Sequence, residues 1–201
     1  MPSDEIEPDY NLLRDPAVQA ALKLSANQRA EIARREREAG AQLRAELAEN
    51  PGLRAEQISP AGKLAGRVNL RLKTVTLTPE QRRGLVARTL WQRGAEAILM
   101  ASEALKLTPQ QNKRLHNAWE SLQKAHLAER LAYMKAHHVP PSGSKSPWNF
   151  GHLTAPQVKA VNDWCVAQDQ QLDTKKWRVA AQVLDGKQRR RLTELLGREP
   201  F

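Results

Sequence analysis

A short motif that recurs along the chain constrains its fold more than any other feature. The clearest copy is Leu107-Thr108-Pro109-Gln110-Gln111, in which a leucine precedes a helix-capping threonine, a proline suited to the first helical position, and a glutamine in fifth place. Four other stretches keep the leucine, the capping side chain and the glutamine: Leu24-Ser25-Ala26-Asn27-Gln28, Leu77-Thr78-Pro79-Glu80-Gln81, Leu153-Thr154-Ala155-Pro156-Gln157 and Leu184-Asp185-Gly186-Lys187-Gln188. Each copy predicts a helix start, and five copies predict a repeated helical architecture.

The composition favours an all-α fold. Ala, Leu, Arg, Gln, Lys and Glu are all good helix formers and dominate the chain, whereas β-branched residues are sparse. Hydrophobic residues make up 40% of the chain and the mean hydropathy is −0.64, which suits amphipathic helices with much exposed surface. We predict an elongated bundle of four or five principal helices, arranged as long antiparallel hairpins. The helix starts are quasi-duplicated, with the copies at Leu24, Leu107 and Leu184 alternating with those at Leu77 and Leu153.

Proline, glycine and serine divide the chain into four predicted parts. Residues 1–11 form a flexible lead-in, residues 12–138 the first half of a helical domain, residues 139–152 a Pro/Gly/Ser linker, and residues 153–201 a helical second half that packs on the first. We expect no deep domain separation.

Within the predicted first half, one stretch is interrupted by proline and glycine and another shows a regular apolar stripe. Residues 53–76 contain Pro60 and Gly66 and predict a loop with a possible short helix, and Gly94 bends or ends the helix before it. Residues 109–138 predict the longest helix, because apolar residues recur at intervals of three and four. The members of that stripe are Leu115, Trp119, Leu122, His126, Leu127, Leu131 and Met134.

The charge balance indicates an acidic partner. The formal net charge is +10 and the isoelectric point is near 10.1, which favours nucleic acid, anionic lipid surfaces or acidic polypeptides. No apolar run approaches the roughly 20 residues that span a bilayer, so we predict no membrane span. The acidic start of the chain is unlike a signal peptide. The protein is therefore cytoplasmic, or it is a mature periplasmic or cell-envelope form from which a signal was removed.

Few residue patterns favour catalysis or metal binding. Neither a His-Glu-x-x-His motif nor a Cys/His cluster occurs. The one metal site to test is at the surface, where His137, His138 and His152 could capture an ion. His126 is expected to lie in the core with its ring nitrogens hydrogen-bonded. Cys165, the single cysteine, predicts a buried and inert thiol. We predict a non-enzymatic protein without a cofactor or a resident metal.

Basic clusters lie on several predicted helices. They are Arg34-Arg35-x-Arg37, Arg82-Arg83, Lys175-Lys176-x-Arg178 and Arg189-Arg190-Arg191. Nucleic-acid binding would require them on one surface, with stacking or base-reading groups nearby. No helix-turn-helix, zinc-finger or RNA-binding signature accompanies them, so nucleic acid stays an alternative.

The repeated Leu-Thr-Pro-Glu/Gln-Gln sequence resembles the LTxxQ motif of the Spy/CpxP-type family of small periplasmic helical proteins. Residues 77–81 and 107–111 match in full, residues 153–157 fit, and residues 24–28 and 184–188 are relaxed copies. The resemblance implies an α-helical hairpin fold, often a homodimer with a basic and partly apolar cradle. It also implies an ATP-independent chaperone or an envelope stress-response module. This chain is longer, has more copies and contains only 3 methionines.

We therefore predict a non-enzymatic protein that binds unfolded or acidic polypeptide through a basic, partly apolar surface, in the homodimer that the resemblance implies. The predicted contact residues are Arg82, Arg83, Arg114, Arg189 and Arg190. The alternatives are a structural or interaction subunit of a larger protein assembly and, third, a nucleic-acid-binding protein. The motif residues themselves are predicted to be structural. They are Leu24, Ser25, Gln28, Leu77, Thr78, Gln81, Leu107, Thr108, Gln111, Leu153, Thr154, Gln157, Leu184, Asp185 and Gln188.

Overall fold

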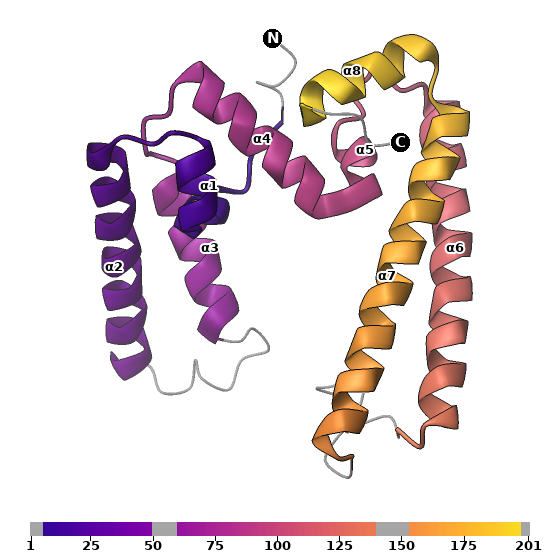
Figure 1. Ribbon diagram of the computed structural model, residues 1–201. Helices are drawn as coiled ribbons and strands as arrows, with labels where there is room; N and C mark the ends of the chain where they lie inside the picture. The colour runs from indigo at the N-terminus through magenta and orange to yellow at the C-terminus, as the bar shows by residue number, and fades with distance from the viewer. Residues whose placement is uncertain (1–5, 50–59, 140–152, 198–201) are drawn as a thin grey trace. The chain divides into compact units, whose positions relative to one another are not determined.

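The protein is all-α, as the sequence predicts. A computed structural model describes residues 6–49, 60–139 and 153–197, and these residues contain helices, turns and bends but no strand (Figure 1). The elements in chain order are η2 (Tyr10–Arg14), α1 (Pro16–Ala21), α2 (Ala26–Glu49), α3 (Pro60–Leu72), α4 (Pro79–Arg93), η4 (Gly94–Glu96), α5 (Ala97–Met100), α6 (Pro109–Ala136), α7 (Ala155–Val183) and α8 (Gly186–Leu196).

The chain forms two compact units. Unit 1 comprises Met1–Arg93 with Glu194–Arg198, and unit 2 comprises Gly94–Thr193 with Glu199–Phe201. This division differs from the predicted one, in which residues 12–138 and 153–201 meet at a linker over 139–152. The boundary falls instead at Gly94, whose φ of +59° ends α4. The predicted linker belongs to unit 2 and, apart from the buried Val139, lies outside the described residues.

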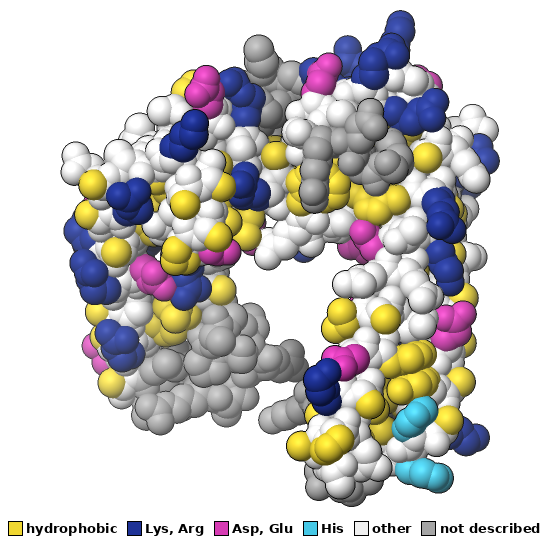
Figure 2. Space-filling view, in the orientation of Figure 1, with side chains coloured by type: hydrophobic (Ala, Val, Ile, Leu, Met, Phe, Trp, Pro, Cys, Tyr) yellow, Lys and Arg dark blue, Asp and Glu magenta, His cyan; other side chains and the backbone are white. Residues whose placement is uncertain are grey.

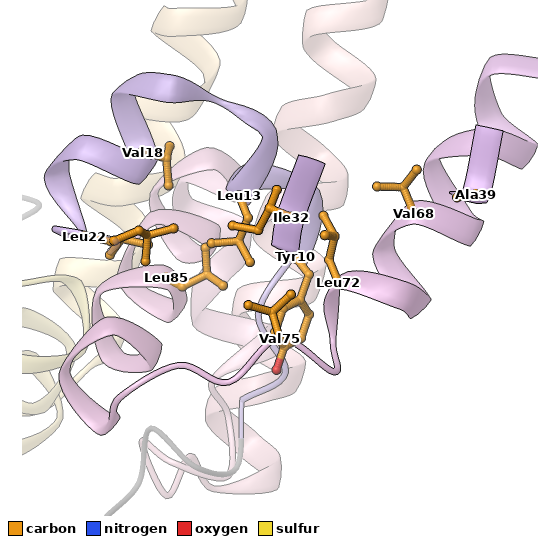
Figure 3. Close-up of a cluster of buried hydrophobic side chains, with 11 residues drawn as sticks. Tyr10, Leu13, Val18, Leu22, Ile32, Ala39, Val68, Leu72, Val75 and Leu85 are labelled. Atoms are coloured by element: carbon orange, nitrogen blue, oxygen red, sulfur yellow. The ribbon is translucent and has the colours of Figure 1, made fainter. Parts of the chain in front are cut away.

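Unit 1 is organised around an antiparallel pair, α2 and α3. Arg35 near the start of α2 donates to the carbonyl oxygen of Arg71 near the end of α3, at 3.2 Å, whereas Glu46 near the end of α2 pairs with Arg67. Short segments before and after the pair cover the same core (Figure 3). Its buried members include Tyr10, Leu13, Val18, Leu22, Ile32, Leu72 and Leu85.

Helix α3 lies in the stretch predicted as a loop with a possible short helix, and it extends over 13 residues. Val68 and Leu72, one turn apart, are fully buried toward α2, while Leu70 between them is 70% exposed. Val68 and Leu72 therefore share one buried face of the helix, and Leu70 lies on another. Pro60 stands at the first helical position, where a helix tolerates proline, and Gly66 lies on the exposed face of the helix. Residues 53–59 lie outside the described residues.

The first described residues also differ from the flexible lead-in predicted over 1–11. Ile6 and Tyr10 are each only 4% exposed, and the Asp9 backbone N–H donates to Thr89 Oγ1 at 2.8 Å. Asp9 also caps η2 through its side chain. Burial of these two side chains fixes this stretch against unit 1.

Unit 2 contains a second antiparallel pair, α6 and α7. Trp119 near the start of α6 donates through Nε1 to the carbonyl oxygen of Lys176 near the end of α7, at 3.4 Å. At the other end of the pair, the rings of Tyr133 and Trp164 stack with centroids 3.7 Å apart. Cys165 is buried in the cluster beneath this stack, as predicted.

Two polar side chains of α7, Asp173 and Lys176, hold η4 against that helix. Asp173 accepts hydrogen bonds from the Ala95 backbone N–H at 2.8 Å and from Trp177 Nε1 at 2.9 Å. One turn away, Lys176 is only 5% exposed, and its Nζ lies 2.6 Å from the carboxylate of Glu96. The buried ammonium is thereby paired, which its burial requires.

Candidate functional site: the motif joints and the surface of unit 2

The first two motif copies form one connected structure, which we call the first joint (residues 24–28 and 77–81). In each copy the backbone N–H of the second motif residue donates to Oε1 of the motif glutamine, at 2.8 Å for Ser25 and 2.9 Å for Thr78. The hydroxyl oxygen of the same residue accepts from the glutamine backbone N–H, at 3.2 Å in both copies. Each copy is thus a complete capping box that satisfies otherwise unpaired helix N–H groups.

The two glutamines of the first joint also bond to each other. Gln28 Nε2 donates to Gln81 Oε1 at 2.8 Å, and Gln81 Nε2 donates back to Gln28 Oε1 at 3.2 Å. Each amide nitrogen also reaches the carbonyl oxygen just before the partner's leucine, at Thr76 and Lys23. The joint therefore ties the start of α2 to the start of α4.

The second joint (residues 107–111 and 184–188) repeats these bonds atom for atom in unit 2. Gln111 Nε2 donates to Gln188 Oε1 at 2.8 Å, and Gln188 Nε2 donates to Gln111 Oε1 at 3.1 Å. The carbonyl oxygens before the leucines, at Val183 and Lys106, accept from the same two nitrogens. Lys106 also shares with Lys23 a positive φ, 53° against 52°.

The joints change the predicted order of the duplication. Each unit contains a motif, a long helix, its antiparallel return and a second motif that closes on the first. The copy at Leu77 therefore corresponds to the one at Leu184, not to the one at Leu153. The predicted alternation is wrong on this point, because the pairing is settled by which glutamines meet and not by distance along the chain.

The fourth motif copy, Leu153–Gln157, caps α7 but stands apart from both joints. The Thr154 backbone N–H and hydroxyl donate to Gln157 Oε1, at 2.9 and 2.8 Å. Gln157 is exposed, whereas the four glutamines of the joints are buried or half-buried. Its leucine packs against the buried cluster of Met134, Val161 and Cys165.

The predicted contact arginines fall at the two joints. Arg82 and Arg83 follow Gln81 in the first joint, and Arg114, Arg189 and Arg190 lie within one turn of the glutamines of the second. Arg82 is half-buried and donates to the Tyr10 hydroxyl at 2.9 Å, so part of its role is structural. Arg83 is exposed. The structure therefore separates the five residues into two groups.

The second joint carries a group of exposed cations, which we call the basic cluster. Its members are Lys106, Lys113, Arg114, Lys187, Arg189 and Arg190. Within the described residues none of the six has an acidic partner, and Figure 2 shows Lys and Arg side chains gathered over α8. Sequence reasoning found three of these residues but not the three lysines, because their grouping depends on the joint.

The cations of the α2–α3 pair are arranged differently. Arg34 and Arg35 both pair with Glu31, and their hydrogen bonds, that of Arg34 above all, lower the pKa of Glu31 from 4.5 to about 2. Arg71 pairs with Glu38 at 3.2 Å. Four arginines of this pair are thus neutralised by neighbouring carboxylates, in agreement with the predicted solvated face of mixed sign: Arg34, Arg35, Arg67 and Arg71.

Three large apolar side chains are exposed on the α6–α7 pair. Leu127, Leu131 and Val166 are 54%, 48% and 56% exposed. Both leucines belong to the predicted apolar stripe but are exposed, because His126 and Arg130 occupy the positions that turn toward Asp169 of α7. We call these three residues the apolar patch.

The three residues of the apolar patch lie on one side of the hairpin. Leu127, Leu131 and Val166 each directly follow a residue that turns toward the opposite helix. In each helix, the residue after one that faces the partner helix is rotated by about 100° about the helix axis. Because the two right-handed helices are antiparallel, this rotation brings both following residues to the same side of the pair. Hydrophobic side chains are visible on this hairpin in Figure 2.

The histidines do not form a cluster in the described residues. His126 Nε2 lies 3.0 Å from Asp169, His137 Nδ1 lies 2.9 Å from the Tyr133 carbonyl oxygen, and His152 lies outside the described part. Within residues 6–49, 60–139 and 153–197 there is no group of three or more His, Cys, Asp or Glu side chains able to hold a metal ion. No described helix has both the length and the apolar composition needed to cross a membrane.

Comparisons with protein-family models, with curated proteins and with solved structures find no match to this chain.

Proposed function

We propose that this protein is a non-enzymatic, polypeptide-binding helical protein that acts as an ATP-independent chaperone of the Spy/CpxP type or as an envelope stress-response module. The observation that carries this proposal is the apolar patch on the α6–α7 pair. Exposed apolar side chains at Leu127, Leu131 and Val166 offer surface that an unfolded segment can cover.

The basic cluster supports the choice of an acidic client. Its cations are exposed and have no acidic partner in the described part of the chain, so they attract negative charge at a distance. An acidic or unfolded polypeptide would then be captured by charge and held on apolar surface. On this proposal the long antiparallel hairpins form an elongated bundle, and the protein works in the periplasm or cell envelope.

Suppression of aggregation without ATP tests the proposal. The probe is reduced α-lactalbumin, an acidic unfolded polypeptide, whose light scattering is followed with and without the protein. We expect suppression by the native chain and its loss in a Leu127→Ser/Leu131→Ser variant. Each leucine buried by a client contributes about 1–2 kcal/mol, so affinity should fall about tenfold or more.

A matched control distinguishes this patch from general surface hydrophobicity. Leu70→Ser removes a leucine that is 70% exposed on α3 and should leave suppression unchanged. Absence of suppression at stoichiometric excess of native protein would overturn the chaperone proposal. An equal loss in the Leu70→Ser variant would overturn the assignment to the apolar patch.

The basic cluster also favours a second candidate, nucleic-acid binding. Six cations, five of them on α6 and α8 and Lys106 in the turn before α6, could neutralise phosphates without reading a sequence. Among the described residues no exposed aromatic side chain accompanies the cluster for stacking on bases, so polypeptide binding remains the first proposal. The remaining alternative, a subunit of a larger protein assembly, would be indicated by co-purification with one partner at a fixed ratio.

A further inference from the structure

A hollow of about 420 Å³ opens to solvent beside the first joint, within unit 1. The end of α1 and the turn after it form one wall, and the N-terminal part of α4 forms the other. Its apolar surface comes from Ala21 and Leu22, and its charged groups are Lys23, Glu80 and Arg88. Small-molecule sites in proteins have volumes of about 300–1,000 Å³ and combine apolar surface with a few polar groups. The hollow therefore has the size and the mixed lining of a ligand site.

Gly84 lets the two walls of the hollow approach closely. A Cβ at this position would lie 2.6 Å from Leu22 Cδ2, so the leucine side chain lies directly against the backbone of α4. Leu22 is 6% exposed and belongs to the core of unit 1. It therefore provides a fixed apolar wall on which the hydrocarbon part of a ligand can lie.

The second joint shows which features of the hollow belong to the joint and which do not. Residues 21–23 and residues 104–106 have the same sequence, Ala-Leu-Lys, before the first motif leucine. Ala21 is nevertheless exposed, whereas Ala104 is only 8% exposed. The same wall is thus open at the first joint and covered at the second.

The opposite wall differs between the two joints. Counted from the motif glutamines, three positions that line the hollow in α4 hold residues of other size or charge in α8. The reciprocal glutamine bonds form in both joints, so they do not depend on these three residues. The differences are Lys187 for Glu80, Arg191 for Gly84 and Leu195 for Arg88.

The charged side chains of the hollow have no partner of opposite sign in the described residues. Lys23 and Glu80 are exposed, and half-buried Arg88 reaches only the Gly84 carbonyl oxygen, at 3.4 Å. A guanidinium is well suited to bind a carboxylate through two parallel hydrogen bonds. Other half-buried arginines of unit 1 already have glutamate partners, namely Arg35, Arg67 and Arg71.

We propose that this hollow binds a small zwitterion with an apolar side chain, of which an apolar α-amino acid such as leucine is the simplest. The ligand carboxylate pairs with Arg88 and Lys23, its ammonium group pairs with Glu80, and its aliphatic part lies on Leu22 and Ala21. The capping box already occupies the polar groups of Thr78 and Gln81, so side chains and not the helix start hold the ligand. The hollow shares no residue with the apolar patch or the basic cluster, and the polypeptide-binding proposal plays no part in the argument.

A chemical-shift titration of the isotope-labelled full chain tests the site with three matched compounds. L-leucine carries both charges, isocaproate lacks the ammonium group, and isopentylamine lacks the carboxylate. We expect leucine to cause saturable shifts at the residues that line the hollow. The other two compounds should bind about tenfold more weakly or worse, because each loses a charged hydrogen bond.

Two substitutions separate the roles of the charged groups. Arg88→Gln should weaken leucine and isocaproate binding about tenfold or more and change isopentylamine binding little. Glu80→Gln should weaken leucine binding and strengthen isocaproate binding, because it removes the partner of the ammonium group and the repulsion of the carboxylate. Arg83→Gln, the matched change at an exposed position of α4 outside the hollow, should alter none of these affinities.

Three results would overturn the proposal. The first is the absence of saturable shifts with leucine at tens of millimolar. The second is isocaproate binding as tight as leucine binding, which would remove the role of Glu80. The third is an equal loss of leucine binding in Arg88→Gln and Arg83→Gln, which would show a general effect of positive charge.

Discussion

Gly94 and Gly66 show how the surroundings of a single residue decide its role. Both interrupt stretches that are otherwise good helix formers, and both look like helix breakers in the sequence. Gly94 has φ of +59°, and a Cβ there would collide with the carboxylate of Asp173. Gly66 lies on the exposed face of α3, where a Cβ would meet nothing within 4 Å.

The two glycines should therefore respond oppositely to alanine. Gly94→Ala forces a left-handed backbone on alanine and displaces Asp173 from the Ala95 N–H and Trp177 Nε1, so we expect a loss of about 2–4 kcal/mol in the free energy of unfolding. Gly66→Ala should add about 0.5–1 kcal/mol, because alanine is the better helix former. Urea denaturation of both variants measures the two values. A stabilising Gly94→Ala would contradict the role given to Asp173.

Each glutamine of a joint interacts with two helices. Its Oε1 caps its own helix, while its Nε2 binds another helix that starts 53 residues away in the first joint and 77 in the second. Helix starts that would otherwise be independent are thus coupled. The motif is a structural joint whose partner motif the sequence did not reveal.

The coupling can be measured by double-mutant cycles. Gln111→Ala and Gln188→Ala should each destabilise the protein by about 1–2 kcal/mol, and the double variant should cost less than their sum by about 0.5–1.5 kcal/mol. The same result is expected for Gln28 and Gln81. Gln111 with Gln28 provides the control, because these residues belong to different joints. Additive effects within a joint would show that the reciprocal bonds contribute nothing.

The cations of the molecule fall into two groups, those in ion pairs and those without an acidic partner in the described residues. The net charge of +10 is a sum over the chain. Arg14, Arg34 and Lys73 lie in ion pairs with carboxylates, whereas the basic cluster has none in the described residues. An anionic partner should therefore respond to where the free charge lies, not to the net charge alone.

Retention on heparin tests this division. Neutralising Arg114, Arg189 and Arg190 to glutamine should lower the salt concentration of elution and flatten the salt dependence of binding by roughly three charges. Arg14→Gln/Arg34→Gln/Lys73→Gln removes the same net charge from paired positions and should have a much smaller effect. Equal shifts in the two variants would show that only net charge matters.

The fold and site could be predicted from the sequence where the decisive interactions are local. Helix starts at Ser25, Thr78, Thr108, Thr154 and Asp185 follow from capping side chains that bond within three residues. The burial of Cys165 also agrees with its apolar neighbours. For residues 53–76 the sequence predicted only a loop with a possible short helix, and the 13-residue α3 is longer because its two buried positions gain their stability from packing on α2.

The sequence by itself determined an all-α protein with five capped helix starts and a strongly basic surface, because capping and composition depend on near neighbours. Only the tertiary structure decided which motifs pair, because each glutamine amide finds its partner at least 53 residues away. It also decided that Leu127 and Leu131 face outward and that six cations gather at the second joint. Those positions depend on how the helices turn toward one another.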